Sequence, residues 1–497
     1  MKKILVPFFA FFLLFAIVYS TNVQGEEEYK VAKLTDNNGY KHNGQATAIN
    51  KSGEVIVVWP EAHAANQNKL MYRIYSFKTK KWTSPKEFPA QDGNNVYVRL
   101  AGGEKHEFFA VWSKGVEPGQ KIYFSRYYDG KWSKPVLISQ PRKHNEFADI
   151  CYDAKNKRAV AIWVNWPGGD NLETYIREFK NLKWGDMKNI SNHPNPSGHP
   201  AITSDGKGNL YTVYMQMTSR KPDERWQIAY NTNRDGKWLK NSIILTDSKP
   251  WKFHPSIAVN EDGTQVMITW YDYGDKMYYY QYVEYNGKQS KWYPVRIIDE
   301  GHKVHAIYYN SVSYLIDRFY FSYVGSDNNV YVKEFYNNSW SDRIQLSDSG
   351  ECIYSLAYAS PYYGLSISWT DKTDNFRQIY VALLKRMKIF IMPPKSIKVE
   401  HHYDEQLFRI MKYNTIEWVK NEENIVDGES LVDYYYVFRV KSDENFDFNA
   451  EPYKKFSNDI ISFADYFNVN DNPESYKYAI IAVDKDGNKS DPLIAQN

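Results

Sequence analysis

Residues 254–292, HPSIAVNEDGTQVMITWYDYGDKMYYYQYVEYNGKQSKW, contain the pattern that decides the fold. The stretch opens with a strand-like run, turns at the Glu-Asp-Gly of 261–263 and continues into a second strand that ends on Trp270. A Tyr-rich third strand follows at 277–282, and a fourth begins near Trp292. Four short strands in a unit of about 50 residues are typical of one blade of a β-propeller.

Two aromatic columns repeat this unit along the chain. An aromatic residue ends each predicted second strand, at intervals of 46–56 residues: Trp59, Trp112, Trp163, Tyr214, Trp270, Tyr323 and Trp369. A tryptophan marks the start of six predicted fourth strands, at intervals of 48–54 residues: Trp82, Trp132, Trp184, Trp238, Trp292 and Trp340. Because two independent columns share one period, we predict an all-β fold with a seven-bladed β-propeller.

Tight turns join the third and fourth strands of a unit, as at Asp129-Gly130. Asp-Gly pairs supply the positive φ angles of two-residue hairpins, so each unit is predicted to be an antiparallel meander. The seventh unit lacks a fourth strand of its own. Residues 29–36 (YKVAKLTD) resemble the fourth strand at 342–348 (DRIQLSD). We predict that they pair into the seventh unit and close the ring, which removes open sheet edges.

The tail departs from the repeat after Pro393-Pro394 and contains strand-like runs at 396–399, 414–419, 434–440 and 476–483. Trp418 lies on the second run, and the last reads Y-x-Y-x-I-x-A-V-D before a G-N-x-S turn. These features resemble a fibronectin type III module, which implies a β-sandwich. The segment 456–467 fits either a helical turn or an irregular crossover. The predicted regions are a signal peptide at 1–25, the propeller at 26–390 and the module at 391–497.

The propeller units resemble the bacterial sialidase-like, or BNR-repeat-like, propellers. That family carries an Asp-box, S-x-D-x-G-x-T-W, in the turn between the third and fourth strands. Here the same turn has a shorter form, as in the Asp-Gly-Lys-Trp of 129–132 and of 235–238. The serine is absent, the Gly-to-Trp spacing is two instead of three, and there is no Arg-Ile-Pro segment. The resemblance therefore implies the fold and transfers no catalytic residue to this chain.

The N-terminus and the bulk charge indicate where the protein works. A basic start at 1–3, an apolar run at 4–20 and small residues before Glu26 predict a secretory signal peptide that is cleaved after Gly25. The alternative is a retained membrane anchor, for which the run is marginally short. We expect a secreted, periplasmic or cell-surface protein with no integral membrane segment after cleavage. A net charge of +3 gives no sign of nucleic-acid binding.

Polar and ionisable residues recur at the predicted strand ends. In a propeller, these strand ends lie together on the top face. Two residues beyond each second-strand aromatic comes a mostly polar column: Glu61, Lys114, Asn165, Gln216, Asp272, Gly325 and Asp371. Predicted first strands begin near three histidines: His199, His254 and His305. Glycoside hydrolysis needs two carboxylates, so the candidate catalytic residues are Glu61, Asp272 and Asp371. Structural roles, as loop caps or bonds between blades, are equally open for every member of these sets.

Ligand contacts are expected from the polar column, the histidines and two tryptophans in predicted top-face loops. The candidate ligand-binding residues are Asn165, Trp166, His199, Gln216, Trp251, His254 and His305. Exposed tryptophan beside polar groups suits sugar rings, although each tryptophan could instead pack its own loop. No short His/Asp spacing favours a metal site, and no P-loop or dinucleotide fingerprint favours a cofactor. We expect neither a metal nor a cofactor.

Three functions remain open from the sequence. The first is an exported propeller that binds a glycan or an extracellular protein through its top face, with the fibronectin-like module as a spacer. The second is a polysaccharide-active enzyme, a glycoside hydrolase or a lyase. The third is a structural scaffold for a surface protein complex. Cys151 and Cys352 fall in different units, so no disulfide is expected.

Overall fold

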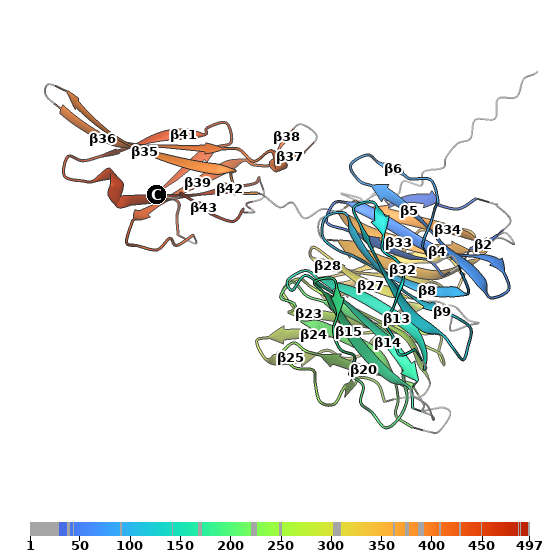
Figure 1. The fold of residues 1–497 in the computed structure, drawn as a ribbon. Coiled ribbons are helices and arrows are strands. Elements are labelled where there is room, and N and C mark those ends of the chain that lie inside the picture. Colours follow the sequence, from blue (N-terminus) through green and yellow to red (C-terminus); the bar gives the residue numbers. More distant parts are fainter. Residues whose placement is uncertain are drawn as a thin grey trace, which may run out of the picture. The chain divides into compact units, whose positions relative to one another are not determined.

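The structure, a computed structural model, divides into two compact units, Met1–Met387 and Lys388–Asn497 (Figure 1). Within the described residues, helix is limited to two 3₁₀ turns, η2 (Glu422–Asn424) and η3 (Pro473–Ser475), so the predicted all-β fold class is confirmed. The predicted signal peptide lies outside the described residues. These are 29–36, 40–42, 44–89, 92–141, 143–166, 171–219, 226–247, 251–301, 310–360, 363–372, 377–385, 392–406, 409–426, 429–448, 450–485, 487 and 489–495.

Seven antiparallel sheets make up the described part of the first unit, and we number them in chain order. Sheet 1 contains β2 (Lys41–His42), β3 (Ala46–Ile49), β4 (Glu54–Ala64), β5 (Gln67–Ser76), β6 (Lys81–Trp82) and β7 (Lys86–Glu87). Sheet 2 contains β8 (Asn95–Gly102), β9 (Glu107–Lys114), β10 (Lys121–Tyr128), β11 (Lys131–Trp132) and β12 (Val136–Leu137). Sheet 3 contains β13 (His144–Asp153), β14 (Arg158–Trp166), β15 (Glu173–Lys180), β16 (Lys183–Trp184) and β17 (Lys188–Asn189).

The next three sheets follow the same meander. Sheet 4 contains β18 (Ser197–Ser204), β19 (Leu210–Met217), β20 (Trp226–Thr232) and β21 (Ile243–Ile244). Sheet 5 contains β22 (Lys252–Val259), β23 (Gln265–Asp272), β24 (Met277–Asn286), β25 (Gln289–Trp292) and β26 (Arg296–Glu300). Sheet 6 contains β27 (Ser311–Leu315), β28 (Arg318–Val324), β29 (Val330–Tyr336), β30 (Ser339–Trp340) and β31 (Ile344–Gln345).

Sheet 7 combines the two ends of the unit. It has the order β1 (Tyr29–Lys33), β34 (Gln378–Leu384), β33 (Gly364–Asp371) and β32 (Cys352–Ser360). The N-terminal strand runs antiparallel to β34, with Tyr29 opposite Leu384 and Lys33 opposite Tyr380. The predicted pairing of the N-terminal strand with the last repeat is therefore confirmed.

The first strands of successive sheets contact one another in chain order, from β3 to β8, β13, β18, β22, β27 and β32, and β32 contacts β3 again. Sheet 7 therefore lies beside sheet 1, because β3 contacts both β32 and β33. This arrangement of meanders is consistent with a β-propeller.

The core lies between neighbouring sheets. Every member of the second-strand aromatic column is at most 1% exposed: Trp59, Trp112, Trp163, Tyr214, Trp270, Tyr323 and Trp369. The tryptophans that start the fourth strands are half-buried, and Trp292 of sheet 5, for example, packs beside Tyr230 of the preceding sheet. Asp129 (φ 47°) and Gly130 (φ 85°) both have the positive φ that their hairpin needs. The two columns are therefore packing positions.

The second unit consists of two larger sheets and a short hairpin. One sheet has the order β35 (Ser396–Gln406), β36 (Arg409–Val419), β41 (Ser462–Phe467), and the other β40 (Lys454–Ser457), β39 (Tyr434–Lys441), β42 (Tyr476–Val483), β43 (Leu493–Ile494). The hairpin pairs β37 (Ile425–Val426) with β38 (Glu429–Ser430). Trp418 and Tyr435 meet across the core at 5.4 Å. The segment 456–467, predicted as a helical turn or an irregular crossover, leads from β40 of one sheet to β41 of the other and is therefore a crossover.

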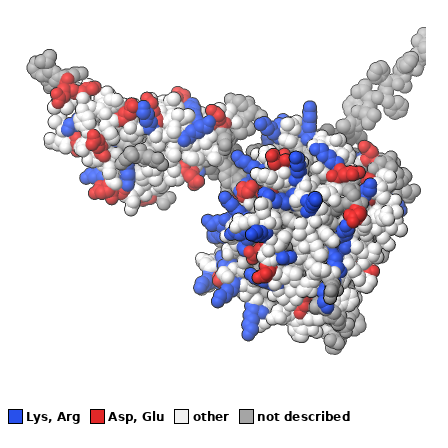
Figure 2. All heavy atoms as spheres, viewed as in Figure 1, with Lys and Arg blue, Asp and Glu red and all other residues white. Residues whose placement is uncertain are grey.

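The surface of the first unit is charged, and its cysteines are inside. Lys and Arg side chains gather over the part that carries β24 and β25 (Figure 2). Cys151 and Cys352 are buried free thiols, and burial raises the pKa of both. The described ranges contain no helix with the length and apolar character that a bilayer span requires.

Candidate functional site

A β-bulge recurs at one position in the first strand of five described sheets. In sheet 5 the register slips between Phe253 and Ser256, so Pro255 falls where no ladder hydrogen bond is needed. One residue in each bulge has a positive φ: Tyr97 (53°), Phe147 (51°), His199 (45°), His254 (48°) and Tyr354 (58°). We call these five the bulge residues. Residues other than glycine rarely adopt this backbone conformation, and those that are held in it tend to cluster at functional sites.

Four of the bulge residues form a continuous row across sheets 2 to 5. The Tyr97 and Phe147 rings are 5.4 Å apart, Phe147 stacks on His199 at 3.9 Å, and His199 meets His254 edge-on at 4.9 Å. The structure thus brings together two of the three histidines that the sequence singled out. His305 lies outside the described residues.

Both histidines of the row are neutral at physiological pH. Burial, followed by the positive charge of Arg99, lowers the pKa of His199 to about 4. Burial, His199 and Arg99 together lower the pKa of His254 well below its usual range. Burial and nearby acidic groups raise the pKa of Tyr97. At pH 7 the row therefore offers two uncharged imidazoles and a protonated phenol beside a guanidinium, a set of groups that can accept and donate protons.

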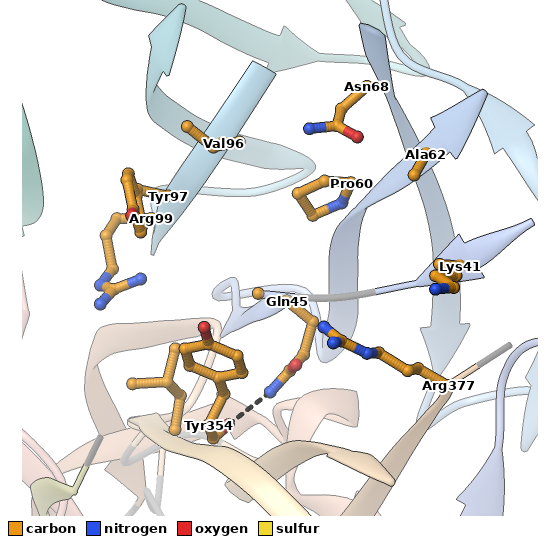
Figure 3. Close-up of a pocket in the computed structure, with 12 residues that line it drawn as sticks. Lys41, Gln45, Pro60, Ala62, Asn68, Val96, Tyr97, Arg99, Tyr354 and Arg377 are labelled. Atoms are coloured by element: carbon orange, nitrogen blue, oxygen red, sulfur yellow. Dashed lines mark hydrogen bonds between the residues drawn. The ribbon is translucent and has the colours of Figure 1, made fainter. Parts of the chain in front are cut away.

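A cavity of about 250 Å³ lies where sheets 1, 2 and 7 meet (Figure 3). Tyr97 and Tyr354 belong to its wall, and the guanidinium groups of Arg99 and Arg377 enter from opposite sides. The wall is formed by Lys41, Gly44, Gln45, Pro60, Ala62, Asn68, Val96, Tyr97, Arg99, Tyr354, Leu356 and Arg377. These residues include three cations and no carboxylate, so the cavity suits an anion.

Hydrogen bonds hold the wall of the cavity in place. The Gln45 side-chain amide donates to the Tyr354 carbonyl at 2.6 Å, and its oxygen accepts from the Thr370 hydroxyl at 2.7 Å. His42 Nδ1 donates to the Arg377 carbonyl at 2.9 Å, while its Nε2 lies 3.2 Å from the Glu61 carboxylate. These interactions of His42 with Glu61 and with the Arg377 carbonyl hold the backbone at Arg377 in place.

The candidate catalytic carboxylates are buried at strand ends, each in its own sheet. Glu61 lies between His42 and His63, whose Nε2 is 3.0 Å away. Asp272 forms a buried ion pair with Lys252 at 2.7 Å and accepts from the Gly274 N–H at 3.0 Å. Asp371, also buried, stands opposite Cys352 on the neighbouring strand. No member of this set belongs to the cavity wall, so the geometry gives no support to a two-carboxylate mechanism there.

The remaining candidate ligand-binding residues have different environments. The Gln216 amide binds the carbonyls of Asn195 and Pro196 at 2.9 and 3.0 Å, which makes it a loop clamp. Trp251 is half-buried and packs 5.8 Å from Phe253. Asn165 is fully buried, and neither polar atom of its side chain has a hydrogen-bond partner within the described residues. Trp166 is 38% exposed and is the tryptophan of this set that can meet a ligand directly.

A second cluster joins the loop after β9 to the start of β13. Each of Glu117, His144 and Glu146 offers one ligand atom, and these atoms lie within 4.8 Å of one another. Burial and the adjacent Glu117 raise the pKa of Glu146 to about 8. Burial also lowers the pKa of His144. No metal site was expected from the sequence, because Glu117 stands 27 residues before His144 and no short His/Asp spacing marks the group.

Sequence reasoning also missed the residues of the cavity wall, above all Lys41, Arg99 and Arg377. A signal for the bulge residues was present, because Tyr97, Phe147, His199 and His254 recur at the period of the aromatic columns. No comparable signal marks the cations. They stand on different strands and loops, and ring closure alone places residue 41 beside residue 377.

Comparisons with known proteins find distant structural similarity. No protein-family model matches the chain, and no curated protein matches it in sequence. A solved structure of the polysaccharide lyase Uly1 is similar, with TM-score 0.47 and 10% identity over 73% of this chain and 94% of that one. The Trypanosoma rangeli sialidase is similar with TM-score 0.43 and 8% identity, over 94% and 88%. AofleA from Arthrobotrys oligospora gives TM-score 0.43 and 10% identity, over 65% of this chain and 90% of that one. At this distance the comparisons do not discriminate among functions.

Proposed function

We propose that this protein is exported and binds an acidic glycan in the cavity between sheets 1, 2 and 7. In this proposal residues 1–25 are a signal peptide, 26–390 form a closed propeller with the seven sheets as blades, and 391–497 form a fibronectin type III-like spacer. The protein acts in a secreted, periplasmic or cell-surface location. The cyclic contacts of the first strands and the two-sheet tail support this architecture.

The cationic wall of the cavity is the observation that carries the proposal. Lys41, Arg99 and Arg377 face a space of about 250 Å³ whose wall holds no carboxylate. Arginine binds carboxylate and sulfate groups through paired charge-assisted hydrogen bonds. Tyr97 and Tyr354 add aromatic rings, which suit the apolar face of a sugar. A space of this size accommodates one charged sugar unit of a longer chain, so recognition centres on a single acidic residue.

Binding to arrayed glycans tests the proposal. We expect retention of glycans that carry uronate, sialic acid or sulfate, and none of neutral ones. Arg99→Ala and Arg377→Ala each remove charge-assisted hydrogen bonds worth about 1.5–3 kcal/mol, so affinity should fall about 10- to 150-fold. Arg296→Ala, an exposed site on the outer strand β26, is the matched control and should bind normally. Equal binding of neutral and acidic glycans, or unchanged affinity in both cavity variants, contradicts the proposal.

The alternative function is cleavage of an acidic polysaccharide by a lyase, and the row of bulge residues is the observation that favours it. β-Elimination needs a cation on the uronate carboxylate, a base for the proton beside it and an acid for the leaving oxygen. Arg99, a neutral imidazole such as His199 and the Tyr97 phenol supply these three groups. A hydrolase has less support, because Glu61, Asp272 and Asp371 lie in three different sheets and none of them belongs to the cavity wall.

Turnover separates the two functions. A lyase leaves a new carbon–carbon double bond, which is followed by ultraviolet absorbance, and His199→Ala and Tyr97→Phe should lower its rate while glycan affinity persists. Binding without any absorbance change across a panel of acidic polysaccharides favours the binding function. A protein that binds no glycan but retains a protein partner supports the third possibility, a structural scaffold.

A further inference from the structure

We propose that Glu117, His144 and Glu146 form a binding site for a divalent transition-metal ion of the Zn²⁺ and Mn²⁺ class. The site goes beyond the proposed glycan binding, because it lies outside the cavity wall and its occupancy is measurable without a glycan. Imidazole and carboxylate are the ligands that such ions take in proteins, whereas Ca²⁺ and Mg²⁺ prefer an all-oxygen set.

The distances suit a common ion. His144 Nε2 and Glu146 Oε2 are 3.3 Å apart, and the ligand atoms of all three residues lie within 4.8 Å of each other. Two ligand atoms bound at about 2.1 Å in tetrahedral geometry are about 3.4 Å from each other. The three side chains therefore already have the spacing of a coordination shell, with room for water as a further ligand.

An unpaired carboxylate oxygen gives a second and independent observation. The His144 side chain is 8% exposed, and its Nε2 lies 3.3 Å from Oε2 of Glu146. This Oε2 is buried and has no hydrogen-bond partner within the described residues. A buried polar atom without a partner costs about 1–3 kcal/mol, and native proteins usually supply an ion or a water there. An ion between the imidazole and the carboxylate would bind both side chains.

The surroundings leave the site open to an ion. The positive charge of Lys121 acts on His144, but the Lys121 ammonium donates to the carbonyls of Lys143 at 2.6 Å and Gly119 at 3.0 Å. Glu117 is exposed, so an ion can enter from solvent through this carboxylate. Tyr97 feels the charges of Glu117 and Glu146, which places the site beside the cavity wall.

Titration of the metal-free protein with Zn²⁺ or Mn²⁺ tests the proposal. After dialysis against a chelator, calorimetry should show one ion per chain, and the melting temperature should rise on addition of the ion. Loss of a mere hydrogen-bond partner of a metal ligand costs about 10–100-fold in affinity. Removal of a ligand, in Glu117→Gln, His144→Ala or Glu146→Gln, should therefore weaken binding by more than about 100-fold.

A matched control comes from a His–Glu pair elsewhere on the same unit. His106 Nδ1 lies 3.2 Å from Glu54, but this pair belongs to no three-ligand group among the described residues. His106→Ala should bind the ion like the parent protein. Glu117→Gln keeps the test decisive if the buried variants misfold, because Glu117 is exposed. No stoichiometric binding by the parent protein, full affinity in Glu117→Gln, or equal loss in His106→Ala would each overturn the proposal.

Discussion

Leu34→Ala tests how the ring is closed. Leu34 directly follows the N-terminal strand and is 1% exposed. It packs in a cluster with Val57, Trp59 and Ile379, which joins sheets 7 and 1, and its N–H donates to the Ile379 carbonyl at 2.8 Å. The backbone bond survives the substitution, so the change removes packing alone.

The expected cost follows from the burial. Leu→Ala at a fully buried site destabilises by about 3 kcal/mol, within a range of roughly 2–5, because transfer and cavity terms add. That is a large fraction of a typical folding free energy of about 5–15 kcal/mol. Val31, two residues inside the strand, is 48% exposed, so Val31→Ala should cost less than about 0.5 kcal/mol.

Denaturant unfolding followed by tryptophan fluorescence is the assay. Of the 15 tryptophans, Trp418 alone lies beyond residue 387, so fluorescence reports almost entirely on the first unit. This matters because a chain of two units need not unfold in a single step. A loss below about 1 kcal/mol for Leu34→Ala, or an equal loss for Val31→Ala, would refute the reasoning that the N-terminal segment closes the ring.

Three further predictions concern the interior of the first unit. Burial and Arg99 lower the pKa of His199 from 6.5 to about 4, so the unfolded state binds more protons than the folded state between these pH values. The free energy of unfolding should therefore fall by up to about 3 kcal/mol as pH drops from 6.5 towards 4. His199→Phe should remove this part of the acid sensitivity in pH-dependent melts, and an unchanged slope would contradict the prediction. Lys252→Met leaves Asp272 buried without its cation and should lower the free energy of unfolding by about 3–5 kcal/mol, as measured by chemical unfolding. The double variant with Asp272→Leu should recover most of this free energy. A single variant as stable as the parent protein would show that the pair is not structural. Cys151 and Cys352 are buried with raised pKa values, so a thiol reagent should label neither in the native protein and both after unfolding; rapid native labelling would be inconsistent with the packing described.

The repeat made much of the fold predictable, because a four-strand meander needs the same residue types at the same places. Trp270 and its counterparts are core positions, and Asp129-Gly130 is a hairpin turn, for reasons that are local in the chain. The N-terminal pairing was also predictable, since 29–36 resembles the fourth strand that the last repeat lacks. Even the meeting of His199 with His254 follows from equal positions in adjacent units.

The candidate site depended on tertiary structure, because the period of a repeat describes strands and not the contacts between sheets. Lys41 and Arg377 share a cavity only because the first and last repeats become neighbours in the ring. Glu117 reaches His144 and Glu146 because the loop after β9 meets the start of the next sheet. Local pattern and turn chemistry thus specify the repeating β architecture and its packing positions. Which charges converge depends instead on closure, bulges and loop paths, and these are tertiary features that the repeat does not encode.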